Sequence, residues 1–348
     1  MSQEPHGRKK RLDFVTVTFG EELGLLKLQA RSFAHFMPAQ LVCSILIVAN
    51  DDSSDQLARH ISETVVPLYG DHAPKVRVLA RTDLCGDYQF KHRGWISQQV
   101  FKLLAARHVQ SDDYVILDTK NHFIRAVAAS DFYASNGKLK HRRTNLLHTR
   151  RPKWLRWLQQ GKQKKLSRRY TGSMRYFGLD PIKFAENSVP KTTPFPMNTG
   201  LVRELITHVE EREGVSFSEW FESYFEATEF YLLQAYASYR GLSFQDLYER
   251  SKPGIIVLYP ESDARLQRLS TTLEMLDNEK QYYCIGVHRK LGACLSAEQK
   301  QVLNDFWRKR GLIEDNEDFD TLITDEASNR FKAKQLPSPK GLQREGSP

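Results

Sequence analysis

The sequence predicts an α/β fold in which a mixed sheet is flanked by helices. Apolar runs of strand length alternate along the chain with stretches whose apolar residues recur at the helical period. Hydrophobic residues make up 40% of the 348 residues and aromatic residues 11%, which is enough for a sizeable core. We expect one large domain over residues 11–312. The tail at 313–348 is expected to be largely disordered, because its last residues lack an apolar period.

The first 120 residues contain four predicted strands. A β-branched run at 13–19 predicts the first strand, and Glu21 and Glu22 follow it as acidic residues that favour the start of a helix. The other strands are predicted at 43–50, 76–79 and 114–117, with helices between them at 55–66 and 96–107. By analogy between folds, this order is typical of a nucleotide-binding half-domain.

The rest of the chain mixes helices with single strands. A basic segment at 138–170 is predicted to be a helical insertion, and a loop rich in Pro and Thr follows at 189–199. Further helices are predicted at 201–213, 218–240 and 296–310, and further strands at 255–258 and 282–287.

The formal charge of +9 comes from one segment. Between Lys138 and Arg169 there are 13 Lys or Arg and no Asp or Glu, so the other residues carry −4 (+9 less 13). A nucleic-acid-binding protein would need basic charge beyond this segment and aromatic residues spread among the cations. Binding to nucleic acid is therefore the weaker alternative function.

The sequence predicts a cytoplasmic protein with reduced thiols. The longest apolar run, residues 41–49, is far shorter than the roughly 20 residues that span a bilayer, and the basic N-terminus lacks the apolar stretch of a secretory signal. The four cysteines form no CxxC pair, so we expect no zinc site.

Polar residues at the carboxyl ends of the predicted strands are the first candidates for a binding site, because ligands of open α/β sheets lie there. Thr18 and Gly20 follow the first strand, Asp51 follows the second, and residues 118–122 follow the fourth. No GxGxxG motif follows the first strand, and the sequence contains no GxxxxGK[ST] motif. A dinucleotide fingerprint and a P-loop are therefore excluded.

The segment VILDTKNHF places Asp118 at the end of a buried strand. A carboxylate in this position can bind a divalent metal ion that bridges a diphosphate, and an Asp that only caps the next turn is an equally favoured alternative. The ammonium group of Lys120 would supply part of the positive charge at this turn, to which Asn121 also belongs.

Two predicted helices carry further candidates. Trp95, Gln98, Gln99 and Lys102 share a polar and aromatic face. This face fits a wall that stacks a base and contacts phosphate, or else a face that packs on a neighbouring helix. Glu229 lies on the aromatic face of the helix at 218–240, where a partly desolvated carboxylate fits a general base, although a structural ion pair is nearly as favoured.

The last predicted strand ends in His288, Arg289 and Lys290. All three side chains can meet phosphate oxygens, and His288 can also bind a metal ion. A single histidine is more often structural, but three such groups after a buried strand favour an anionic ligand.

Six segments are combined in one order along the chain: DFVTVTF, GWISQQVFKL, ILDTKNHF, FPMNTG, ATEFYLLQAY and IGVHRKL. Together they resemble bacterial GT-A-like proteins of a largely uncharacterised glycosyltransferase family, over roughly residues 11 to 300. The resemblance implies a GT-A fold. It also implies transfer of a sugar from a nucleotide-sugar donor to a glycan or lipid-linked acceptor, often in bacterial surface polysaccharide synthesis.

The resemblance also implies roles for single residues. Asp118 matches the first position of a DxD-like element, but Lys120 stands in place of the second Asp, which leaves dependence on Mn²⁺ or Mg²⁺ open. Glu229 matches a late acidic residue, and His288 matches a histidine that turns toward the metal or the diphosphate. The expected catalytic residues are Asp118, Lys120 and Glu229. The expected donor contacts are Thr18, Gly20, Asp51, Trp95, Gln98, Gln99, Lys102, Asn121, Arg289 and Lys290, and the expected acceptor contacts are Asn198, Thr199 and Gly200.

Two further alternatives concern Lys120 and the basic segment. With Lys120 in the DxD-like element, a catalytically inactive nucleotide-sugar-binding module is also allowed. In RRPKWLRWLQQGKQKK, the spacing of Trp154, Trp157 and Leu158 predicts a short amphipathic basic helix. This helix fits contact with an anionic inner-membrane surface, contact with an acidic or lipid-linked acceptor, or a solvated insertion.

Overall fold

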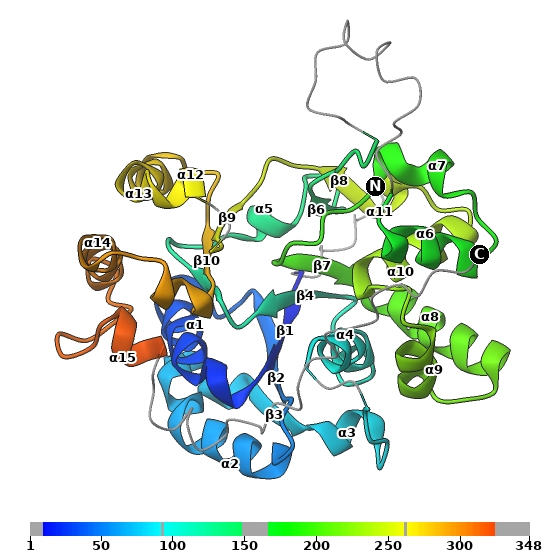
Figure 1. Cartoon of the computed structure of the whole chain (residues 1–348), viewed down its shortest axis with the longest axis horizontal. Helices are drawn as coiled ribbons and strands as arrows, with labels where there is room; N and C mark the ends of the chain where they lie inside the picture. The colour runs from blue at the N-terminus through cyan, green and yellow to red at the C-terminus, as the bar shows by residue number, and fades with distance from the viewer. Residues whose placement is uncertain (1–9, 92–93, 148–165, 261–262, 324–348) are drawn as a thin grey trace, which may run out of the picture.

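A five-stranded sheet lies at the centre of the molecule, which the computed structural model describes over residues 10–91, 94–147, 166–260 and 263–323 (Figure 1). The strand order is β3-β2-β1-β4-β7; the first four strands are parallel, and β7 is antiparallel to β4. The strands are β1 (Leu12–Thr18), β2 (Val42–Ala49), β3 (Val76–Ala80), β4 (Asp113–Asp118) and β7 (Phe195–Asn198). The mixed sheet flanked by helices confirms the predicted fold class.

Helices cover both faces of this sheet. In Figure 1, α1 (Leu23–Phe36) and α4 (Trp95–Leu104) lie on opposite sides of β1. Strands that are buried on both faces read as continuous apolar runs, as in the VCSILIVA of β2, and β1 is buried along its whole length. This double burial explains why the parallel strands could be predicted from the sequence.

Further helices, most of them short, lie between the strands along the chain. They are η1 (Gly20–Glu22), α2 (Ser54–Thr64), η2 (Val66–Lys75), α3 (Arg81–Cys85), η3 (Ala105–Arg107), α5 (Ala129–Phe132), α6 (Arg168–Tyr176), α7 (Pro181–Phe184), η6 (Ala185–Asn187), α8 (Thr199–Glu213) and α11 (Phe244–Leu247). No helix in the described ranges has both the length and the apolar character needed to cross a bilayer.

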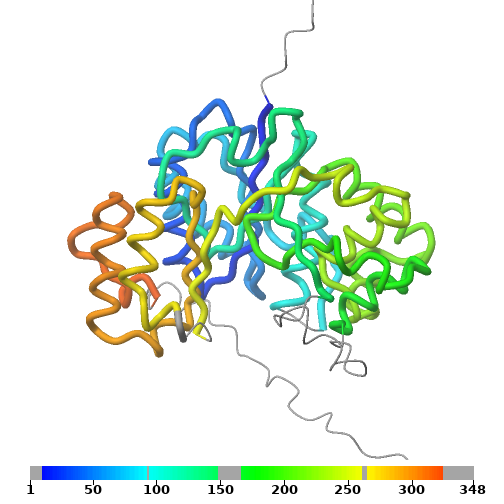
Figure 2. The backbone as a smooth tube through the Cα atoms, turned by 90° about the horizontal axis from the view of Figure 1, so that it is seen from above, coloured from blue at the N-terminus to red at the C-terminus, as the bar shows by residue number. Residues whose placement is uncertain are grey.

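A second sheet, of order β5-β10-β9, packs against the C-terminal helices. Its strands are β5 (Asn121–Phe123), β9 (Ile255–Leu258) and β10 (Cys284–Val287). The helices α12 (Asp263–Leu266) and α13 (Leu269–Asn278) lie between β9 and β10 in the chain, and η7 (Arg289–Ala293) and α14 (Ala297–Arg308) follow β10. The indole Nε1 of Trp307 donates a hydrogen bond of 2.8 Å to Nε2 of His122, which ties α14 to β5. Figure 2 shows these helices on one side of the central sheet and residues 168–250 on the other.

The predicted helix at 218–240 is wrong, because the structure divides it in two. α9 (Phe217–Tyr224) ends at Phe225, which has a left-handed backbone (φ 50°), and α10 (Glu229–Tyr239) starts anew after Thr228. The Thr228 hydroxyl accepts a hydrogen bond from the backbone N–H of Tyr231, as an N-terminal cap does. The aromatic stripe hid this break, since it continues across both helices.

The predicted domain boundary at residue 312 lies too early. α15 (Phe319–Ile323) packs against α1, and the Phe319 and Leu322 side chains are buried. At Gly24 of α1 an added Cβ would lie only 1.8 Å from the backbone oxygen of Leu322, so the two helices are in close contact. The tail predicted to be disordered is therefore packed up to residue 323, and residues 324–348 lie outside the described residues.

The ends of the basic segment belong to the folded body. Residues Leu139–His141 form β6, which pairs in parallel with β8 (Tyr248–Arg250), and α6 begins at Arg168. The predicted amphipathic helix with Trp154 and Trp157 lies outside the described residues. The prediction of a helical insertion at 138–170 can therefore be compared only with the two ends of the basic segment. The first end forms a strand, β6, and the second end begins a helix, α6.

Candidate functional site

The carboxyl ends of β1, β2 and β4 meet at one edge of the central sheet. Thr18 at the end of β1 is opposite Ala49 of β2, and Val17 is opposite Asp118 of β4. The backbone N–H of Gly20 donates a hydrogen bond to Oδ2 of Asp51 (3.3 Å), which joins the turns after β1 and β2. These predicted site residues thus lie along the edge where ligands of such sheets bind.

Asp118 lies between two lysines at this edge. Nζ of Lys102, on α4, is 2.8 Å from Oδ1 of Asp118 and 3.2 Å from Oε1 of Glu229, on α10. Lys120 forms an ion pair with the other oxygen, Oδ2. The Lys102 side chain is 6% exposed and that of Glu229 7%, whereas Asp118 and Lys120 are 19% and 15% exposed. The outer part of the cluster, Asp118 and Lys120, is therefore the part open to a ligand.

Burial and the two ammonium groups act in opposite directions on the carboxylates. Burial alone would raise the pKa of Asp118, but Lys102 and Lys120 lower it well below its usual value. Burial raises the pKa of Glu229 despite Lys102, because this side chain has one ammonium partner at a longer distance. Burial lowers the pKa of Lys102, but the two carboxylates more than compensate and raise it above its usual value. Asp118 and Lys102 are therefore both charged at neutral pH.

The turn that carries Asp118 is held by Gln29 of α1. Its Nε2 donates to the backbone oxygens of Asp118 (3.0 Å) and Asn121 (2.9 Å), while its Oε1 accepts from the Thr16 hydroxyl (2.7 Å). The backbone N–H of Asp118 donates to Oδ1 of Asn121 (2.8 Å). Asn121, predicted to contact the donor, is buried and closes this turn.

The end of β10 lies beside Lys120, as the sequence predicts for His288 and Arg289. The backbone N–H of Val287 donates to the oxygen of Lys120 (3.0 Å). The ring of Tyr259, which follows β9, is 5.8 Å from the His288 ring and 5.8 Å from Nζ of Lys120. The structure thus joins the two predicted parts of the site, strand β4 and strand β10, through Tyr259.

The acidic turn after β1 also enters this site. Nη1 of Arg289 lies 2.5 Å from Oε2 of Glu21, and its Nε lies 3.9 Å from Oε1 of Glu22. Burial raises the pKa of Glu22, which also accepts a side-chain hydrogen bond from Thr119 and lies near Lys120. These acids neutralise Arg289, while Lys290 donates its backbone N–H to Nδ1 of His288 (3.1 Å).

The predicted common face of α4 is divided by depth. Trp95 is 48% exposed and carries the Arg169 guanidinium 3.5 Å from its ring centre, whereas Gln99 and Lys102 are buried and Gln98 is half-buried. Phe225, also 48% exposed, lies 5.7 Å from the same guanidinium. Trp95 therefore belongs to an exposed aromatic group, and Lys102 belongs to the buried charge cluster.

The structure does not bring Asn198, Thr199 and Gly200 to this site. Asn198 pairs with Asp113, at the opposite end of β4 from Asp118. Its side chain caps α8 by accepting from the N–H of Leu201 (3.0 Å), which is a structural role. The turn FPMNTG is thus a strand followed by a helix cap.

The residues around Asp118 are a poor set of metal ligands. Both oxygens of Asp118 contact ammonium groups, and His288 accepts a backbone N–H at Nδ1. Within the described ranges, no three His, Cys, Asp or Glu residues are grouped so as to hold a metal ion. The predicted pair of metal ligands, Asp118 and His288, is not completed by a third.

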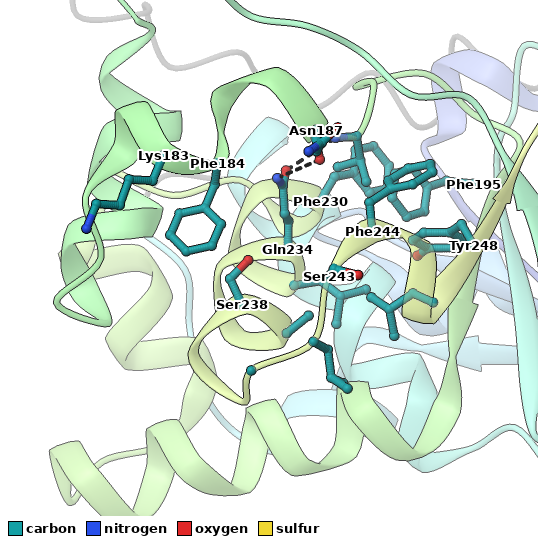
Figure 3. A pocket seen from close by; sticks show the side chains of 16 residues that line it. Lys183, Phe184, Asn187, Phe195, Phe230, Gln234, Ser238, Ser243, Phe244 and Tyr248 are labelled. Atoms are coloured by element: carbon teal, nitrogen blue, oxygen red, sulfur yellow. Dashed lines mark hydrogen bonds between the residues drawn. The ribbon is translucent and has the colours of Figure 1, made fainter.

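Two pockets flank the charge cluster. One, of about 460 Å³, is lined mainly by apolar residues, among them Phe230, whose ring centre is 5.5 Å from Nζ of Lys102. Nε2 of Gln234 donates to the backbone oxygen of Asn187 in its lining (Figure 3). The other, of about 320 Å³, includes Tyr259 in its lining. Its basic lining residues are Lys140, Arg142, Lys252 and Arg265.

A comparison with protein families bears on this arrangement. The family described as "Family of unknown function (DUF6492)" matches residues 18–282. The chain belongs to this family. The match to DUF6492 begins at Thr18, the last residue of β1, and includes Asp118 and Glu229; it ends before β10, so His288 and Arg289 lie beyond it. Among curated proteins, none matches the sequence significantly.

Solved structures similar to this DUF6492 chain include the galactosyltransferase LgtC in complex with donor and acceptor sugar analogs. It is 10% identical, with 86% of this chain and 100% of that chain covered and a TM-score of 0.46. The glycosyltransferase GlyE of Streptococcus pneumoniae TIGR4 is 10% identical (93% and 66% covered, TM-score 0.38). The glucosyl-3-phosphoglycerate synthase of Mycobacterium tuberculosis, solved with Mn²⁺ and UDP, is 11% identical (80% and 86% covered, TM-score 0.37).

Sequence reasoning missed four residues that build the site: Gln29, Glu22, Tyr259 and Arg169. Glu22 was read only as an acid that starts a helix. Gln29 lies on the buried face of α1, and an amide among apolar residues was a signal available in the sequence. Tyr259 follows a predicted strand, so the strand-end rule that found Asp118 would also have found it.

Proposed function

We propose that the protein transfers a sugar from a nucleotide-sugar donor to an acceptor. The observation that carries the proposal is the cluster at the carboxyl end of β4, where Asp118 and Lys120 lie beside the end of β10 with His288 and Arg289. Five of the six segments that resemble a glycosyltransferase family in sequence contribute to this cluster, and the sixth, FPMNTG, lies at the other end of β4. The cluster is partly open to solvent and positively charged on its outer side at Lys120.

The chemistry of the transfer requires positive charge at the leaving group. The bond between the anomeric carbon and the diphosphate oxygen breaks, and its electron pair stays on the diphosphate. The acceptor oxygen then bonds to the anomeric carbon and loses its proton. Cations aimed at the developing charge lower the barrier most. Lys120 is the more exposed of the two lysines in the cluster, and Lys290 follows the adjacent strand, next to Arg289, which Glu21 and Glu22 neutralise.

Glu229 acts in this proposal as a positioning residue. Its carboxylate is buried and paired with Lys102, which is the structural alternative left open by the sequence. Glu229 and Asp118 hold the Lys102 ammonium between them, and Lys102 in turn orients Asp118. Glu229 is therefore not the general base that takes the proton from the acceptor hydroxyl.

The acceptor side is proposed at the basic pocket next to Tyr259. Lys140 and Arg142 come from the basic segment, Lys252 follows β8, which pairs with β6, and Arg265 comes from α12. Four cations in one pocket favour an acidic glycan or a lipid-linked acceptor that carries phosphate. Replacing Arg142 and Lys252 together by Ser should raise the KM for such an acceptor at least tenfold and leave the affinity for the donor nucleotide unchanged.

Contact of residues 138–170 with an anionic membrane surface, and with it a peripheral location at the inner membrane, stays a prediction. Co-sedimentation with anionic liposomes at low and high salt tests it. Replacing Trp154 and Trp157 by Ala should reduce binding if the two rings insert.

A thermal-melt panel tests the proposed function. UDP, GDP, ADP and CMP are added at about 100 times a Kd found by titration, with and without Mn²⁺ or Mg²⁺. A ligand at that ratio stabilises the fold by about 2.7 kcal/mol, which is roughly 4 °C for a chain of this size. Lys120→Met should remove most of the shift, and the exposed Lys183→Met on α7 is the matched control.

Three results would contradict the proposal. A melting temperature unchanged by every nucleotide would show that the protein binds no such donor, and an equal loss of the shift in Lys183→Met would show that binding does not depend on this site. Nucleotide binding without transfer or hydrolysis of any sugar donor would identify the inactive binding module instead.

A further inference from the structure

We propose that Lys120 occupies the place of a divalent cation, so that the donor diphosphate binds here without a metal ion. The inference rests on the proposed function. It concerns which group carries the positive charge at the site, and it has a readout that needs no nucleotide.

The first argument is the occupancy of the Asp118 carboxylate. Lys102 contacts Oδ1 at 2.8 Å, and Lys120 contacts Oδ2. A divalent ion binds a carboxylate oxygen at about 2.0 to 2.6 Å. At that distance it would lie beside an ammonium group on either oxygen, and the repulsion between the two cations would be strong in a site this buried. Neither oxygen is open to a metal ion while both lysines stay in place.

The second argument is the chemistry of Lys120 itself. A lysine is ordinarily an ammonium at neutral pH, and Lys120 is paired with the carboxylate of Asp118. An ammonium has no lone pair and cannot bind a metal ion. It does have three N–H donors, of which the ion pair with Asp118 engages one, and two remain to meet phosphate oxygens.

The third argument is that Lys120 is held in place. Its backbone oxygen accepts from Val287 of β10, its Nζ lies 5.8 Å from the centre of the Tyr259 ring, and its side chain stays 15% exposed. A fixed and partly exposed ammonium provides positive charge without reorganisation during the reaction. Lys102 cannot take this role, because it is buried between Asp118 and Glu229.

Binding of Mn²⁺ alone, followed by electron paramagnetic resonance, tests the inference without any donor. The wild-type protein should bind no Mn²⁺ at Asp118 at 1 mM (roughly the upper range of weak protein sites). Lys120→Asp restores two carboxylates two residues apart and should bind Mn²⁺ at least tenfold more tightly. Lys183→Asp makes the same change of charge at an exposed position of α7 and should bind as the wild type does.

Titration with the nucleoside diphosphate found in the melt panel gives the second arm. The wild-type Kd should change less than twofold between EDTA and Mn²⁺. Lys120→Met should weaken binding at least tenfold in both buffers, and this variant also serves if Lys120→Asp does not fold. Lys120→Asp should bind the nucleotide only with Mn²⁺.

Three outcomes would overturn the inference. One is Mn²⁺ binding by the wild type that Asp118→Asn removes. Another is a wild-type Kd that rises tenfold or more in EDTA. The last is a folded Lys120→Asp protein that binds no Mn²⁺. In each case nucleotide binding by the wild type can still be observed, so failure of the inference is distinct from failure of the proposed function.

Discussion

Replacing Lys102 by Met should destabilise the protein strongly, and more at high pH than at low pH. The substitution removes the ammonium that lies 2.8 Å from Asp118 and 3.2 Å from Glu229 and leaves two carboxylates with 19% and 7% exposure close together. Removing one partner of a buried ion pair costs about 3 to 5 kcal/mol. Met has nearly the same length, so little of the loss comes from packing.

The pH dependence follows from Glu229. Burial already raises its pKa, and without Lys102 the chief group that opposes burial is gone, so the pKa rises further. An acid whose pKa is higher in the folded state than in the unfolded state favours folding as the pH falls. The stability deficit of Lys102→Met should therefore narrow between pH 8 and pH 5, by about 1.4 kcal/mol for each unit of the added rise in pKa.

Urea unfolding at pH 8 and pH 5 measures this deficit. Lys309→Met, which removes an exposed ion pair with Asp277 (3.0 Å), is the control and should change stability by less than about 1 kcal/mol at both pH values. Adding Glu229→Gln to Lys102→Met should restore part of the loss, because one unpaired charge disappears. A deficit below 1 kcal/mol, or one that is equal at both pH values, would refute the electrostatic reasoning.

Three further substitutions test other parts of the structure by urea unfolding. Asp13→Ala should lower the free energy of unfolding by about 3 kcal/mol or more, because it leaves buried donors unpaired. Buried Asp13 accepts hydrogen bonds from the N–H groups of Gln110 and Ser111 (2.8 and 2.7 Å) and from two serine hydroxyls. A loss below 1 kcal/mol would contradict this. Gly24→Ala should loosen the docking of α15, because its Cβ would meet the Leu322 backbone at 1.8 Å, whereas Gly200→Ala, with its nearest contact at 3.4 Å, should be tolerated. His141→Phe should make the stability less sensitive to acid, because burial lowers the pKa of His141 to about 3. The wild-type protein therefore loses about 1.4 kcal/mol of its free energy of unfolding per pH unit as the pH falls from about 6.5 toward that value. An unchanged dependence of stability on pH in the variant would count against the prediction.

The parallel part of the fold could be predicted because its strands are buried on both faces and bounded by helices of clear period. β7 and β5 were missed for a physical reason. β7 is a strand of four residues inside a loop rich in Pro, and β5 is a strand of three residues directly after Asp118, so neither shows the alternation of apolar and polar residues on which a prediction depends.

The sequence singled out several residues that the structure brings together at the candidate site, but it did not show which of their side chains contact each other. The strand-end rule placed Asp118 and Lys120 at the edge of the central sheet where parallel strands end together, and it also singled out His288, although β10 belongs to the second sheet. The sequence could not show that Lys102 reaches Asp118 from α4 or that Glu229 meets the same ammonium, since these contacts depend on how two helices pack. The acceptor turn at Asn198 was placed by resemblance alone, and the antiparallel direction of β7 carries it to the other end of β4.

The pairing of β10 with β5 has a consequence for the order in which the chain folds during synthesis. The backbone oxygen of Lys120 accepts from the backbone N–H of Val287, and the His122 ring accepts from the Trp307 indole, so the loop after Asp118 is held by residues made more than 160 positions later. The ribosome would already have released the entire central sheet by then. A nascent chain that ends near residue 254 would have Asp118, Lys102 and Glu229 but not Tyr259 or His288. The ability to retain a nucleotide should therefore arise late in translation, after the C-terminal helices have closed on β5.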